Sequence, residues 1–290
     1  MYITRRIKVV LVTAFSLFLV AIFVAAGLSV ASGVNWWRAG LANSTVLNGI
    51  DFGVFNQLYE KRIDQTFKVT SAQAIVFSAS IGDVTVSEGA GDQVEVVASA
   101  GFGGFNLASA KQQADSYQLQ ATRTPNQLQL SLGNASGLNA LHKVSIQLVV
   151  PIHAAVQVTS DMGNVNANGS FKAIQVQDNM GNISVTGNVT SSTTLDDKMG
   201  NIFYQGDPGQ SSNITNNMGN VTVVLTGTRP LQVDATTDLG NVSGALSVIT
   251  AQTAHHLSGA TAGGQGKGQA GIVTVVNNLG NINISEVKNG

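Results

Sequence analysis

A three-residue motif that recurs along the second half of the chain constrains the fold more than any other feature. The motif is Met or Leu, then Gly, then Asn, and successive glycines are 18, 19, 19, 21 and 40 residues apart. A period of this length is typical of proteins built by stacking similar units. The last separation is about twice the others, so we expect one repeat to be interrupted there. The six copies are Met162-Gly163-Asn164, Met180-Gly181-Asn182, Met199-Gly200-Asn201, Met218-Gly219-Asn220, Leu239-Gly240-Asn241 and Leu279-Gly280-Asn281.

Short alternating segments flank most copies of the motif. Ile174-Gln175-Val176 precedes the second copy, for example, and Ile183-Ser184-Val185 follows it. Apolar residues at every second position predict β-strands, because a helix would need a period of 3.6. Each unit is then strand, turn, strand, turn, which is too short to bury a core alone. The predicted fold is therefore all-β: a parallel β-solenoid, β-helix-like, of about 20-residue rungs spaced ~4.8 Å apart.

Each position of the motif has a predicted role in such a stack. We expect the Met or Leu to point inward and form an apolar column, and the Gly to adopt a positive φ. The Asn is expected to hydrogen-bond the Asn of the next rung in an amide ladder. Residues 69–150 carry a related motif, Ile81-Gly82-Asp83-Val84, so 69–290 is predicted to form one domain. Further strands are predicted at Gln93–Ala98, Tyr117–Thr122, Gln127–Leu132 and Lys143–Val150.

The N-terminal segment is predicted to anchor the chain in a membrane. Residues 9–31 contain no charged side chain and are long enough to cross a hydrocarbon core. Arg5, Arg6 and Lys8 precede them, which favours a cytoplasmic N-terminus and an extracellular C-terminal domain. A cleaved signal peptide is the alternative, although its apolar region is usually shorter. The predicted organisation is a cytoplasmic N-terminus at 1–8, a transmembrane helix at 9–31, a stalk or linker at 32–68 with a short helix near Phe55–Arg62, and the repeat domain at 69–290.

Composition narrows the function classes. Charged residues make up 11% of the chain and the net charge is −1, so no basic face is available for nucleic acid. Cysteine is absent, which excludes disulfides, thiol catalysis and Cys-based metal sites. Stability must then come from burial and backbone hydrogen bonds.

The acidic residues near the turns do not predict a metal or catalytic site. Asp161, Asp178 and Asp238 come close to the turn of three rungs, and a column of carboxylates could bind Ca²⁺. Lys198 takes that position in another rung, however, and turn formation by Asp and Asn explains the pattern without metal. The one local carboxylate pair, Asp196-Asp197, places its two side chains on opposite faces of a strand, so it is unsuited to acid/base catalysis.

Two other motifs are also interpreted without ligands. His255-His256 lacks a third metal ligand nearby, which favours a solvated loop. The Gly-rich insertion Gly259–Gly271 contains Lys267 but no following Ser or Thr and no following helix, so a phosphate-binding loop is not predicted. We predict no catalytic residue, no cofactor-binding residue and no metal ligand in this chain.

Several segments together resemble a known bacterial family. Ile81-Gly82-Asp83-Val84, a strand ending Val149-Val150-Pro151, and the run from Val158 to Val165 are similar to the "putative adhesin" family of uncharacterised β-strand-repeat domains. The resemblance covers residues 69–290. It implies an exported or membrane-tethered protein, in some members beside envelope-stress signalling systems, and it implies no catalytic residues.

Three functional hypotheses follow. The first is a non-catalytic structural or adhesive module at the cell surface, whose partner is cell-wall glycan or another envelope protein. It rests on polar residues expected to face outward, namely Ser184, Thr186, Thr222, Ser243 and Asn283. The second is an envelope-stress sensor or modulator that works through a membrane partner. The third is a scaffold that self-associates through the ends of the stack, because unpaired terminal strands invite pairing. An enzyme is not expected.

Overall fold

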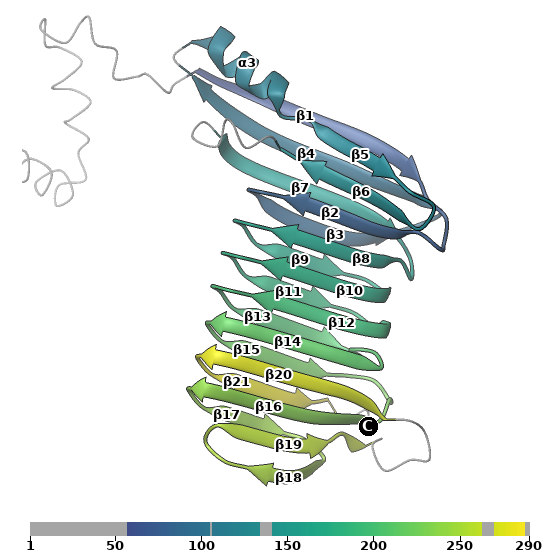
Figure 1. Ribbon diagram of the computed structural model, residues 1–290, viewed down its shortest axis with the longest axis vertical. Coiled ribbons are helices and arrows are strands. Elements are labelled where there is room, and N and C mark those ends of the chain that lie inside the picture. Colours follow the sequence, from purple (N-terminus) through teal and green to yellow (C-terminus); the bar gives the residue numbers. More distant parts are fainter. Residues whose placement is uncertain (1–56, 105, 134–140, 263–269, 288–290) are drawn as a thin grey trace, which may run out of the picture. The chain divides into compact units, whose positions relative to one another are not determined.

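The computed structural model describes residues 57–104, 106–133, 141–262 and 270–287 (Figure 1). All of these described residues belong to one compact unit. The predicted transmembrane helix at 9–31 lies outside the described residues, and the structure gives it no support. Within the described part of the chain, no helix is both long enough and apolar enough to cross a membrane.

The strands form two large sheets. Sheet A has ten strands, in the order β1-β4-β7-β3-β9-β11-β13-β15-β21-β17, and sheet B has eleven, in the order β18-β19-β16-β20-β14-β12-β10-β8-β2-β6-β5. Sheet A consists of β1 (Gln57–Lys68), β4 (Gln93–Gly104), β7 (Leu141–Pro151), β3 (Asp83–Gly89), β9 (Val165–Asn168), β11 (Ile183–Thr186), β13 (Ile202–Gly206), β15 (Val221–Leu225), β21 (Ile282–Glu286) and β17 (Val242–Ala245). Sheet B consists of β18 (Val248–Gln252), β19 (His256–Ala260), β16 (Leu231–Leu239), β20 (Gly271–Leu279), β14 (Ser211–Met218), β12 (Val189–Asp197), β10 (Phe171–Asp178), β8 (Ala155–Ser160), β2 (Ala74–Ala79), β6 (Gln127–Leu132) and β5 (Leu119–Arg123).

The all-β prediction is confirmed, but the predicted closed parallel solenoid is wrong. The central strands of both sheets are parallel, as in β9-β11-β13-β15 and β8-β10-β12-β14. At the ends, β1-β4, β4-β7, β5-β6, β16-β19 and β18-β19 are antiparallel, so both sheets are mixed and no closed solenoid forms. For β5-β6 and β18-β19 the cause is local, because a short turn joins the two strands directly and a strand that returns through a short turn must pair antiparallel. The other three antiparallel pairs join strands that are distant in the chain.

The rungs are not stacked in chain order. The last two strands, β20 and β21, lie between β14-β15 and β16-β17, as the yellow strands in Figure 1 show. The β18-β19 hairpin lies in the chain between the last two copies of the motif. This hairpin accounts for the doubled spacing, which was correctly interpreted as an interruption.

The core lies between the two sheets and follows the predicted alternation. In β11, Ile183 and Val185 are buried while Ser184 and Thr186 point outward. Buried Val, Ile, Leu and Phe side chains from both sheets form one continuous cluster. Apolar burial of this kind is the main driving force for folding.

Two local predictions near the N-terminal end of the unit are corrected. The segment near Phe55–Arg62 is not helical, because Gln57–Lys68 form β1 along β4. The polar run that follows β4 instead contains helix α3 (Leu107–Ser116). A capping box starts this helix: the Asn106 side chain accepts from the Ser109 N–H, and the Ser109 hydroxyl oxygen accepts from the Asn106 N–H.

Candidate binding surfaces

The outward face of sheet A carries a column of residues aligned across six strands, which we call the outer column. Strand register joins neighbouring members directly in the parallel pairs β9-β11, β11-β13, β13-β15, β15-β21 and β21-β17. One member is the aromatic residue Phe203, which is half-buried between its neighbours Ser184 and Thr222. The outer column consists of Asn166, Ser184, Phe203, Thr222, Asn283 and Ser243. Of the five residues predicted to face outward, four belong to it and Thr186 lies beside it.

This face is almost free of charge. The six short strands that carry the outer column, β9, β11, β13, β15, β21 and β17, contain one residue that is charged at neutral pH, Glu286. The Glu286 carboxylate accepts from the backbone N–H groups of Ser247 and Ala262, so it serves the neighbouring loops. The face therefore presents hydroxyl and amide groups and one aromatic ring. Such groups can donate and accept hydrogen bonds without a charged side chain.

The predicted amide ladder is confirmed. The Nδ2 atom of Asn182 donates to the Oδ1 atom of Asn164 at 2.9 Å, and Asn201 donates to Asn182 at 3.1 Å. Backbone N–H groups of Asn220 and Asn281 continue the ladder by donating to the Oδ1 atom of the preceding rung. These amides mainly satisfy one another, so the ladder stabilises the turns.

The Met and Leu residues of the motif do not point inward as predicted. Their side chains lie on an outer corner between the sheets and are 39–64% exposed. The alternation of the strand stops at the turn: Val176 and Asp178 face the core, whereas Met180 already belongs to the turn. We call this exposed row the Met/Leu ridge; it consists of Met162, Met180, Met199, Met218, Leu279 and Leu239.

A buried polar column runs through sheet B just before the turns. Ser160, Asp178, Asp197, Asn216, Asn277 and Thr237 are aligned by strand register, and all are buried. The Nδ2 atoms of Asn216 and Asn277 donate to the carbonyl oxygens of Gly200 and Gly219, at 3.0 and 2.9 Å. Thr237 bonds the Gly280 carbonyl in the same way. The column thus caps turn carbonyls from inside the core.

Two aspartates occupy this column without a matching donor. Both carboxylate oxygens of Asp178 lack a hydrogen-bond partner among the described residues, and so does one carboxylate oxygen of Asp197. The pKa of Asp197 is raised to about 6, chiefly by burial and also by the nearby carboxylates of Asp178 and Asp196, against hydrogen bonds from backbone N–H groups that lower it. Burial also raises the pKa of Asp178. A protonated carboxyl can donate where the asparagines donate.

The acidic residues considered as a turn column therefore divide into two sets. Asp161 and Asp238 are exposed beside the Met/Leu ridge, in one register with Asn179 and Lys198, whereas Asp178 lies one residue earlier and faces the core. The side chains of Asp196 and Asp197 lie on opposite faces of β12, as predicted, with Asp196 outward and Asp197 toward the core. Among the described residues, no group of three or more His, Asp or Glu is placed to hold a metal ion.

The His pair is split between a turn and a strand. His256 belongs to β19, and its Nε2 atom lies 3.0 Å from the Oδ2 atom of Asp234 on β16. His255 is exposed in the preceding turn. Residues 263–269 of the Gly-rich insertion lie outside the described residues.

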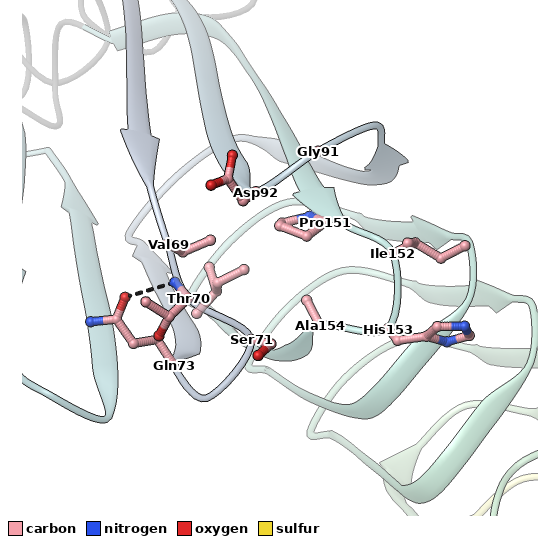
Figure 2. A pocket seen from close by; sticks show the side chains of 11 residues that line it. Val69, Thr70, Ser71, Gln73, Gly91, Asp92, Pro151, Ile152, His153 and Ala154 are labelled. Atoms are coloured by element: carbon pink, nitrogen blue, oxygen red, sulfur yellow. Dashed lines mark hydrogen bonds between the residues drawn. The ribbon is translucent and has the colours of Figure 1, made fainter.

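A pocket of about 220 Å³ opens beside the turns that follow β1, β3 and β7 (Figure 2). Ser71, Asp92 and His153 line it, but the His153 ring points away from the other two in Figure 2. The Gln73 side chain is occupied, because it accepts from the Thr70 N–H and donates to the Thr124 carbonyl. The pocket could not be predicted from the sequence, since its residues come from three separate turns.

Comparisons with known proteins found similarity only among solved structures. No protein-family model matches the chain, and no curated protein matches it. A "putative cell adhesion protein" from Clostridium sporogenes is 13% identical, with a TM-score of 0.48 over 78% of this chain and 100% of its own. A "putative adhesin" from Bacteroides fragilis is 13% identical, with a TM-score of 0.32 over 78% of this chain and 97% of its own. A "putative adhesin" from Parabacteroides distasonis is 9% identical, with a TM-score of 0.24 over the same shares. At these values the comparisons assign neither a family nor a function to this chain.

Proposed function

We propose that this chain is a non-catalytic adhesive module that acts at the cell surface and binds a neutral glycan along the outer face of sheet A. The observation that carries the proposal is the outer column, in which Phe203 is surrounded by aligned hydroxyl and amide side chains on a nearly uncharged face.

The chemistry of this face suits sugar hydroxyls. Ser, Thr and Asn can each donate and accept, so they match a hydroxyl group in either role. The negative face of an aromatic ring attracts the C–H groups of a pyranose ring. Uncharged polar groups also lose less hydration energy on contact than charged groups would. A neutral glycan is therefore favoured over an anionic one.

The repeat distance supports an extended ligand. Neighbouring parallel strands are ~4.8 Å apart, which is close to the length of one sugar residue in an extended β-1,4-linked chain. Six aligned strands can thus meet successive sugars of one polymer. Individual contacts of this kind are weak, and their combination along a polymer raises the apparent affinity.

The test is a binding isotherm of the full-length protein on insoluble chitin and on isolated peptidoglycan, with dextran as an unrelated glycan. We expect saturable binding to a β-1,4-linked glycan, weakened at least tenfold by Phe203→Ser. Val76→Ser is the matched control, because Val76 is a half-buried outward residue of sheet B. Equal loss in both variants, or no binding to any glycan by folded protein, would refute the proposal. The regulatory hypothesis and that of self-association through the ends remain predictions.

A further inference from the structure

The Met/Leu ridge is the largest aligned set of exposed apolar side chains in the described residues. Six of the eleven large apolar residues exposed there belong to it. The backbone keeps them in line: the N–H groups of Gly163, Gly181 and Gly200 each donate to the carbonyl of the Met in the next rung, at 2.9–3.1 Å. Six rungs at ~4.8 Å give a straight ridge roughly 24 Å long.

The fold does not require apolar residues at these positions. The turn needs the Gly for its backbone conformation and the Asn for the amide ladder. Neither role involves the side chain of the Met or Leu. A side chain that is about half exposed gains only part of the stabilisation that full burial of an apolar group gives. The residues just before the ridge in the same turns are polar, namely Asp161, Asn179, Lys198, Asn217, Asn278 and Asp238; we call them the flanking column. Six apolar residues in one exposed row therefore indicate a surface that something covers.

We propose that a second copy of this chain covers the ridge, with the two ridges packed antiparallel around a two-fold axis at Met180. A second copy offers the same spacing, so side chains of one ridge can interdigitate with those of the other over several rungs. The rows that pair around this axis present on the order of 400 Å² of apolar side chain per copy, and the flanking columns bring the pair to the ~1,000 Å² that a specific interface needs.

Charge complementarity and the number of paired rows together select the register, because an axis between Met218 and Leu279 would also pair Lys198 with an aspartate, Asp238, but would leave four paired rows. A two-fold axis at Met180 brings Met162 opposite Met199 of the other copy, and hence Asp161 opposite Lys198, twice per dimer. Ile81, Met162, Met180, Met199 and Met218 then form five paired rows. An axis at the middle of the ridge would pair all six rows but would place Asp161 against Asp238, which is repulsive. Lys198 is the one cation of the flanking column, so an anionic membrane is a poorer match than a second copy.

The absence of cysteine from the sequence permits a direct cross-linking test on the full-length protein. Met180→Cys places one thiol on the proposed axis, and we expect a disulfide-linked dimer under mild oxidation. Leu239→Cys is the matched control: it is the most exposed ridge position but lies outside the five paired rows. Cross-linking of Leu239→Cys equal to or above that of Met180→Cys would overturn the proposal.

Charge reversal provides the second measurement. In sedimentation equilibrium, Lys198→Asp is expected to weaken dimerisation at least tenfold, because the change acts twice per dimer. Adding Asp161→Lys is expected to restore it. A monomer at all concentrations, or a dimer insensitive to both changes, would contradict the proposal. Glycan binding uses the outer column instead, so either result leaves the proposed function separately testable.

Discussion

Replacing Asp197 with Asn is expected to stabilise the protein at neutral pH. Asp197 is fully buried, and one of its carboxylate oxygens has no partner among the described residues. A Cβ on Gly200 would contact both this oxygen and the Gly181 carbonyl oxygen, so the two oxygens lie close together. In the next rungs, Asn216 and Asn277 place an amide nitrogen there and donate to the turn carbonyl. Asn at position 197 would donate to Gly181 in the same way.

The magnitude follows from the pKa of Asp197, which burial raises from 3.8 to about 6. The folded state therefore holds the proton more tightly than the unfolded state. This contribution to the free energy of unfolding is fully present below pH 4 and is lost as the pH rises through about 6. A shift of about two units corresponds to ~3 kcal/mol. The charged groups nearest in sequence and register are Asp178, Asp196 and Lys198. Burial raises the pKa of Asp178 as well.

The assay is thermal unfolding of wild type and Asp197→Asn at pH 4.5 and pH 7.5. At pH 7.5 we expect the variant to unfold roughly 6–12 °C higher, since 1 kcal/mol shifts Tm by about 2–4 °C at this size. At pH 4.5 the folded wild-type protein holds the proton, so the difference should fall to roughly a third of its value at pH 7.5. Asp196→Asn is the control, because that side chain points outward. An equal Tm at pH 7.5, or the same gain at both pH values, would refute the reasoning.

Three further substitutions test the stack. Gly219→Ala should lower the free energy of unfolding in urea by at least ~3 kcal/mol, because φ is +138° and a Cβ would overlap the Gly200 carbonyl oxygen. The control is Gly91→Ala, which is also at positive φ but in open space and should cost only ~1–2 kcal/mol. A similar cost at both positions would argue against close rung contact. Asn201→Ala should cost ~1–2 kcal/mol because it removes a link of the amide ladder, whereas exposed Asn166→Ala should be nearly neutral. Tyr204→Phe should cost ~1 kcal/mol by removing the hydrogen bond from its buried hydroxyl to the Gly187 carbonyl; an unchanged unfolding midpoint would show that bond to be unimportant.

Much of the repeat could be predicted from the sequence because its determinants are local. Alternation around Ile183 and Val185 fixes which side chains face the core, and the Gly-Asn pair fixes the turn and the amide ladder. Strands over 127–132 and 143–150 were predicted at nearly their observed positions, whereas the strand predicted over 93–98 continues to Gly104.

The stacking order and the exposed surfaces could not be predicted in this way. The strand edges of all rungs are nearly the same in sequence. No local signal therefore indicates that β20 lies between β14 and β16, or that β21 lies between β15 and β17. Whether the Met180 side chain points inward depends on the residue at which the strand ends. Asp178 and Asn179 are both turn-forming residue types, so the sequence does not show which of them ends the strand. Helix α3 has a capping box but only a weak apolar pattern, so its signal was easily missed.

The central claim is that the outer face of sheet A holds a neutral glycan. Hydrogen–deuterium exchange of the full-length protein, with and without saturating soluble β-1,4-linked N-acetylglucosamine oligosaccharide, tests this claim most directly. The account predicts slowed exchange in β11, β13 and β15, around Phe203, with no change in β8, β10 and β12 of sheet B. Protection confined to the pocket near Ser71 and His153, or no protection anywhere, would contradict it.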